Sequence, residues 1–130
     1  MTSVIYASIS AFIIIWLSLN VIKNRRQYKV SIGDGGNEQL KIAMAAQSNA
    51  IEYIPIALIL LFALEYNEGN IFIVHLLGLT LIIGRIIHAK GILSGKLKTR
   101  ILGMQITIYT MIGLAILNII YLPFAKLLEY

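Results

Sequence analysis

The chain has 130 residues, of which 58% are hydrophobic and 13% charged, whereas soluble domains carry about 25% charged residues. So few charges cannot cover a surface that faces water, so we expect one membrane-embedded domain over residues 1–130. Cysteine is absent, which excludes disulfides, thiolate metal sites and a cysteine nucleophile. With two histidines and no cluster of acids beside them, we expect no metal site. The basic residues flank apolar segments and form no patch, so we expect no nucleic-acid partner.

Four segments are apolar and long enough to cross a bilayer as helices, which takes about 20 residues each. Their lengths favour helices over the strands of a β-barrel, which alternate over about ten residues. We expect the first segment to remain in the protein, because no charged region precedes it and a basic flank follows it. The expected fold is all-α, an integral membrane four-helix bundle with spans at Val4–Ile22, Ile42–Leu64, Ile71–Ile87 and Ile101–Phe124.

The three loops between these spans differ in charge. The first and third loops are rich in lysine and arginine, and the second contains Glu65 and Glu68 without a base. Loops rich in lysine and arginine stay in the cytoplasm. We therefore expect the first and third loops to be cytoplasmic and both termini to lie on the opposite side of the membrane.

One acid, Glu52, falls inside the second span. An ionisable side chain in a span costs roughly 3 kcal/mol on insertion scales, so it marks a functional site by default. Counting about 1.5 Å per residue from Leu64 places Glu52 about 12 Å below the cytoplasmic edge of the bilayer. Helical spacing predicts that Gln47 faces nearly the opposite way from a polar stripe formed by Lys41, Ala45, Ser48, Asn49, Glu52 and Tyr53.

This stripe has two interpretations. In the first, the sole role of Asn49 and Glu52 is to hold neighbouring helices together through hydrogen bonds. Alternatively, the acid and nearby cations form a cytoplasmic site for a small zwitterionic or polyanionic ligand, since arginine binds carboxylates in a bidentate manner. The cations near that level are Arg25, Arg26, Arg85, His88 and Arg100. Arg25 and Arg26 could instead serve only to orient the chain.

Two motifs resemble the family of membrane-associated proteins in eicosanoid and glutathione metabolism (MAPEG). Ser18–Ser31 (SLNVIKNRRQYKVS) is similar to the end of that family's first helix, and Ala46–Pro55 (AQSNAIEYIP) to its second-helix signature. The resemblance covers nearly the whole chain and is greatest to the bacterial inner-membrane branch. It implies a homotrimer in the inner membrane, with glutathione held between protomers on the cytoplasmic side.

The resemblance also implies an activity, that of a glutathione-dependent transferase or peroxidase. Its second substrate would be a lipophilic electrophile or a lipid hydroperoxide, with glutathione as co-substrate and no metal. Arg100 would be the catalytic residue that stabilises the thiolate of glutathione. The residues implied to bind glutathione are Arg25, Gln47, Asn49, Glu52, Tyr53 and His88.

The chain departs from the family pattern at three positions. Ala45 replaces an arginine, and His88 and Ile92 replace two tyrosines. Lys41, one turn before Ala45, could supply the missing charge, although a lysine lacks the bidentate geometry of arginine. These departures leave open a non-catalytic membrane protein of the same fold that binds a lipid or a thiol. The four spans and the one carboxylate in the membrane leave open a small proton-coupled exporter.

Overall fold

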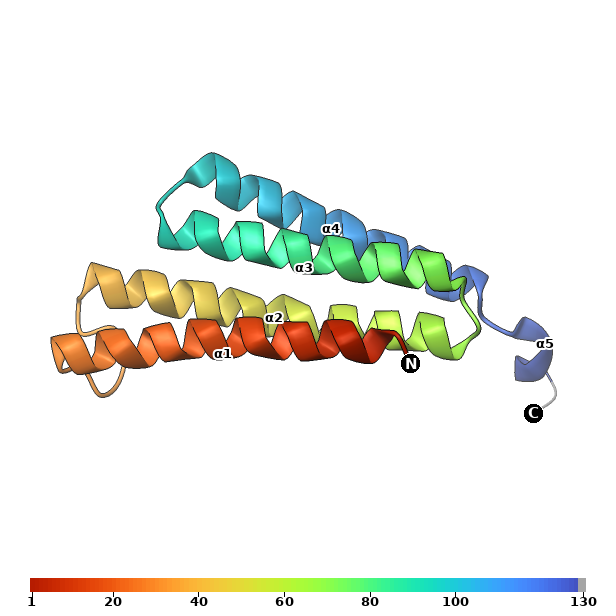
Figure 1. The fold of residues 1–130 in the computed structure, drawn as a ribbon, viewed down its shortest axis with the longest axis horizontal. Helices are drawn as coiled ribbons and strands as arrows, with labels where there is room; N and C mark the ends of the chain where they lie inside the picture. Colours follow the sequence, from red (N-terminus) through yellow and green to blue (C-terminus); the bar gives the residue numbers. More distant parts are fainter. Residues whose placement is uncertain (129–130) are drawn as a thin grey trace.

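The structure is a computed structural model that describes residues 1–128 and consists of four long helices and one short one (Figure 1). Each long helix is long and apolar enough to cross a membrane, which confirms the predicted all-α fold. The helices are α1 (Ser3–Tyr28), α2 (Glu38–Tyr66), α3 (Ile71–Leu93), α4 (Leu97–Ile120) and α5 (Phe124–Leu127).

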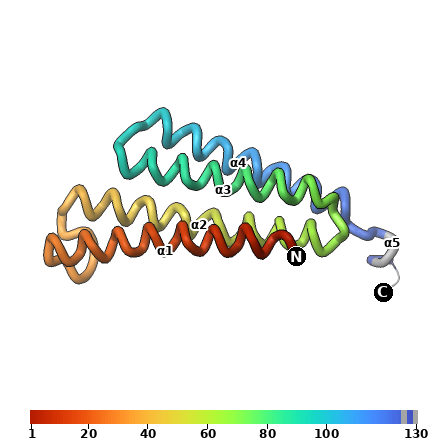
Figure 2. Tube along the Cα trace, in the orientation of Figure 1, coloured from red at the N-terminus to blue at the C-terminus, as the bar shows by residue number. Residues whose placement is uncertain are grey.

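The long helices form two hairpins, α1–α2 and α3–α4, that pack side by side (Figure 2). Within the described residues, α2 and α3 contact each other and both outer helices, whereas α1 and α4 do not touch. The α1–α2 and α3–α4 loops lie at one end of the bundle, called here the basic end. The N-terminus and the α2–α3 loop lie at the other end, called the acidic end (Figure 1).

The ends of the helices differ from the predicted spans in a way that polar residues explain. Three helices are longer than expected, because helical structure continues through polar residues at the bundle ends. The fourth has the predicted length but is shifted toward the N-terminus: it begins at Leu97 instead of Ile101 and ends at Ile120 instead of Phe124. Pro123 cannot continue a helix, and the residue before a proline disfavours helical backbone. The predicted C-terminal end of the fourth span was therefore wrong by four residues.

Two glycines bring α3 and α4 into backbone contact at the basic end. A Cβ atom on Gly91 would lie 2.3 Å from the backbone nitrogen of Arg100, and one on Gly103 would lie 2.3 Å from that of His88. Small residues allow such close approach between membrane helices. The contact places the start of α4, and with it Arg100, directly against the end of α3.

Candidate functional site

The polar stripe of α2 divides into two rows. Its outer row, Lys41, Ala45, Ser48 and Glu52, is exposed, whereas Asn49 and Tyr53 are half-buried and lie toward α3. Neighbouring residues differ by about 100° around a helix axis, so one step along the chain separates the rows. The predicted single face is therefore a surface row beside a partly buried row.

Arg85 of α3 contacts the buried row. Its side chain is 1% exposed, Nη2 donates to Asn49 Oδ1 at 2.5 Å, and the guanidinium lies 5.6 Å from the centre of the Tyr53 ring. Arg85 Nε and Nη1 are buried and have no hydrogen-bond partner among the described residues. Leaving a buried charged donor unpaired is costly. The cluster therefore has hydrogen-bonding capacity that its own chain does not use.

Glu52 is also under-used. Its Oε1 accepts one hydrogen bond, from Ser48 Oγ one turn earlier at 3.2 Å. Among the side chains that the structure describes, no lysine, arginine or histidine forms an ion pair with this carboxylate. Because the side chain is exposed on the surface of the bundle, the carboxylate is free to receive a hydrogen-bond donor or a cation from outside the chain.

A pocket of about 300 Å³ opens at the basic end, between the start of α2 and the α3–α4 hairpin. Lys41 and Arg100 bring positive charge to this pocket and Glu38 brings one acid. Ser48 and Glu52 continue the row of Lys41 and Ala45 toward the bilayer interior, beyond the pocket. The full lining is Glu38, Lys41, Ile42, Ala45, Gly91, Ile92, Gly95, Leu97 and Arg100.

His88 lies behind this pocket and not on its surface. It is 2% exposed, and its Nδ1 lies 2.9 Å from the backbone oxygen of Arg100. Its Nε2 is buried without a partner among the described residues. The His88 ring therefore connects α3 to the start of α4. Of the two positions where the family has tyrosines, His88 and Ile92, only Ile92 lines the pocket.

Arg25 and Gln47 occupy the other side of α2, at its contact with α1. Arg25 Nη1 donates to the backbone oxygen of Gly33 at 2.8 Å, and Gln47 Nε2 donates to Ser18 Oγ at 2.9 Å. Neither residue lines the pocket of Lys41 and Arg100. Within one chain, the predicted site residues thus form two separate groups on opposite sides of α2.

The sequence interpretation missed the central place of Arg85. It counted this arginine only among the cations near the cytoplasmic edge, whereas the side chain is buried against Asn49 and Tyr53. A signal was present, because Arg85 lies within the apolar third span, where an ionisable residue indicates a functional site. No three histidine or acidic side chains gather as metal ligands anywhere in residues 1–128.

Comparison with known proteins agrees with the earlier resemblance. The model of the MAPEG family matches residues 3–120. The inner membrane protein YecN of Escherichia coli, both from strain K12 and from the O6:H1 strain CFT073, is 36% identical over 123 residues, which cover 95% of this chain and 94% of YecN. The family match spans all four long helices and both groups of candidate residues. The chain therefore belongs to the MAPEG family.

Proposed function

We propose that this protein is a membrane-bound, glutathione-dependent transferase or peroxidase that acts on lipophilic electrophiles or lipid hydroperoxides. The observation that carries the proposal is the basic pocket of Lys41 and Arg100, whose α2 row continues to the unpaired carboxylate of Glu52. Membership of the family supports it. YecN is named as an inner membrane protein, and we extend that location to this chain, with the basic end in the cytoplasm.

The charges in and beside the pocket match those of glutathione. This tripeptide carries two carboxylates, one ammonium group and a thiol. Lys41 and Arg100 bind carboxylate or thiolate groups, and Glu52, deeper along α2, binds the ammonium group. Lys41 lines the same pocket wall as Ala45, so it supplies part of the charge that an arginine at that position would have provided.

A second copy of the chain completes the site in this proposal. Arg25 and Gln47 cannot reach the Arg100 pocket of their own chain, because they lie on the α1 side of α2. In a homotrimer, that side of one protomer faces the pocket side of the next. The two groups of residues then enclose one glutathione between them, and the outer row of α2 is covered by protein.

The chemistry depends on the thiolate of glutathione. A guanidinium nearby stabilises the thiolate over the thiol, and we assign this role to Arg100. The thiol first loses its proton to water. The thiolate then attacks a carbon of the electrophile and forms a carbon–sulfur bond, while the leaving atom takes the bonding electron pair and then a proton from water. Holding both reactants together supplies much of the rate. Because the nucleophile is the substrate's own sulfur, the protein needs no cysteine.

Thermal unfolding of the detergent-purified protein tests the proposal. Millimolar glutathione is expected to raise the unfolding midpoint, and Glu52→Gln is expected to abolish that rise. Glu68→Gln, a change at the acidic end, serves as the matched control and keeps it. If glutathione leaves the midpoint of the unaltered protein unchanged, the proposed ligand is wrong.

Turnover of a model electrophile separates catalysis from binding. We expect Arg100→Ala to lower the conjugation rate by roughly a hundredfold, the usual size for loss of one group that stabilises developing charge. The second candidate function is non-catalytic binding, which the neutral Ala45 and the buried His88 favour. A glutathione-dependent shift in midpoint without any turnover would establish that alternative.

A further inference from the structure

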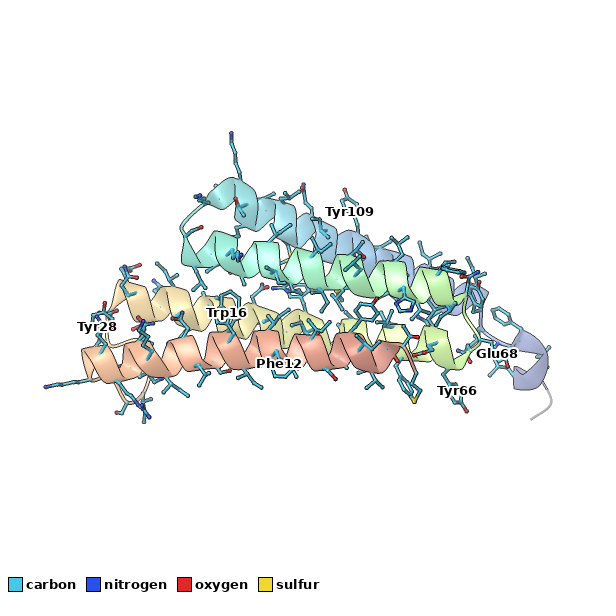
Figure 3. All side chains as sticks on the ribbon, viewed as in Figure 1. Phe12, Trp16, Tyr28, Tyr66, Glu68 and Tyr109 are labelled. Atoms are coloured by element: carbon cyan, nitrogen blue, oxygen red, sulfur yellow. The ribbon has the colours of Figure 1, made fainter. Side chains whose placement is uncertain are left out.

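A separate groove lies between α1 and α3, on residues that the proposed glutathione pocket does not include. It has a volume of about 330 Å³ and apolar walls apart from one charge, that of Lys90. Phe12 and Trp16, both labelled on α1 in Figure 3, are exposed there. The groove is lined by Ile9, Phe12, Ile13, Trp16, Ile86 and Lys90. Its walls match a hydrocarbon chain.

A second pocket adjoins this groove at the basic end, and Lys90 lines both. We call it the polar pocket after four of its five lining residues, which are Lys90, Leu93, Ser94, Lys96 and Thr99. The polar pocket measures about 480 Å³, and Lys96 adds a second positive charge to it. Ser94 and Thr99 contribute hydroxyl groups, although Ser94 Oγ already donates to the backbone oxygen of Lys90. Neither the groove nor the polar pocket contains an acid. Two uncompensated cations thus stand where the apolar groove ends.

We propose that the groove and the polar pocket together form a binding site for an anionic glycerophospholipid of the bilayer. One acyl chain lies along Phe12 and Trp16, and the phosphate group is bound by Lys90 and Lys96. Basic pockets between membrane helices bind anionic headgroups in this way. The orientation of the chain in the membrane requires positive charge near the α3–α4 loop. It does not require that Lys90 and Lys96 stand at the end of an apolar groove.

Charge complementarity selects this occupant over two others. A free phosphate ion would pair with the lysines but leave Phe12 and Trp16 without a partner. A neutral lipid would fill the groove but leave Lys90 and Lys96 uncompensated. Only an anionic lipid satisfies both parts. The site shares no lining residue with the pocket of Lys41 and Arg100, so it does not depend on the proposed enzymatic function.

Trp16 allows a direct test, because it is the single tryptophan of the chain and lines the groove. The full chain is reconstituted in bilayer nanodiscs that contain either phosphatidylglycerol or phosphatidylcholine with brominated acyl chains, at equal mole fraction. Bromine quenches tryptophan fluorescence only at short range. We expect brominated phosphatidylglycerol to quench Trp16 at a several-fold lower mole fraction than brominated phosphatidylcholine does.

Three variants identify the headgroup contacts. Each lysine is expected to supply part of the preference for phosphatidylglycerol, so Lys90→Gln alone should reduce it and Lys90→Gln with Lys96→Gln should abolish it. Lys98→Gln removes a charge from the same loop outside the polar pocket and should keep the preference. Equal quenching by both lipids, an equal loss in Lys98→Gln, or no quenching by either lipid because protein covers Trp16 would each overturn the proposal.

Discussion

Two carboxylates on α2, one at the acidic end of the bundle and one midway along the helix, have very different surroundings. Glu65, at the acidic end, accepts hydrogen bonds from the backbone nitrogens of Thr2 and Ser3 and from Ser3 Oγ, and it lies 3.8 Å from the N-terminal amine. Glu52, midway along α2, accepts one hydrogen bond, from Ser48 on its own helix. The two residues have the same chemistry and the same helix, but only Glu65 is fully engaged.

The difference separates a structural acid from a binding acid. The first amides of α1 have no partner within their helix, and Thr2 provides no side-chain cap. Glu65 satisfies them and places negative charge at the positive end of the helix dipole. Its hydrogen bonds therefore connect the start of α1 to the end of α2. Glu52 fastens nothing, so its cost in a membrane span is explained only by a group that comes from outside the chain.

The same contrast extends to the neighbouring polar residues. At the acidic end, Tyr6 donates to the backbone oxygen of His75 at 3.1 Å, and its hydroxyl lies 2.8 Å from His75 Nδ1. Nearer the basic end, Arg85 has one hydrogen-bond partner, and two of its buried donors have none among the described residues. Polar side chains that pair within the chain hold helices together, whereas unpaired ones indicate a site.

The largest effect is expected where α3 and α4 meet behind the candidate site. Gly103→Ala would push a methyl group into the backbone of His88, and we expect a loss of about 3 kcal/mol of unfolding free energy. Gly113→Ala is the matched control, because its Cβ atom would lie 3.7 Å from Leu77 Cδ2, an ordinary contact. Unfolding in a detergent titration measures both. Equal stability of the two variants would contradict the role of the glycine contact.

Glu65→Ala sharpens the comparison of the two acids. The variant leaves the first amides of α1 unpaired, so we expect a loss of about 2 kcal/mol, as for the loss of a charged cap. Glu52→Ala should lose no stability in the absence of ligand. The measurement is the same detergent titration. If Glu52→Ala proves the more destabilising variant, Glu52 is a packing residue and the contrast fails.

Arg85→Met is expected to stabilise the ligand-free protein, whereas the two preceding structural variants destabilise it. An apolar side chain of similar length removes two buried donors that have no partner in the part of the chain that the structure describes, so we expect the ligand-free protein to gain about 1 kcal/mol of unfolding free energy. The gain is limited because Asn49 loses its hydrogen bond to Arg85. The thermal midpoint without ligand reports the change. A loss of several degrees would show that Arg85 stabilises the fold as Glu65 does.

The smallest effect is expected at Ser48. Ser48→Ala removes the hydrogen bond to Glu52, but both side chains are exposed, so stability should change by less than about 0.5 kcal/mol. The variant instead tests whether Ser48 orients Glu52 for a ligand. A glutathione affinity lowered by a factor of roughly three, read from the midpoint shift, is the expected result.

Hydrophobic periodicity and charge are properties of single segments, so the sequence alone was enough to assign them. The apolar runs predicted four helices, and helical spacing predicted which residues of α2 would share a polar stripe. The sequence placed Arg85 and His88 near the cytoplasmic level of the membrane, but it did not predict which residues they contact. Whether such a side chain is buried depends on how α3 rotates against α2 and α4, and no local pattern encodes that rotation.

The sequence by itself determined the membrane class, the four spans and the position of Glu52 within an apolar run, because hydrophobicity and helical spacing act within one element. Only the tertiary structure decided which polar groups find partners. The close approach of α3 to α4 at Gly91 and Gly103 brings Arg100 to the pocket of Lys41, and the contact of α2 with α3 buries Arg85. Hydrogen bonds between helices depend on packing in three dimensions, so they appear only after the bundle is assembled.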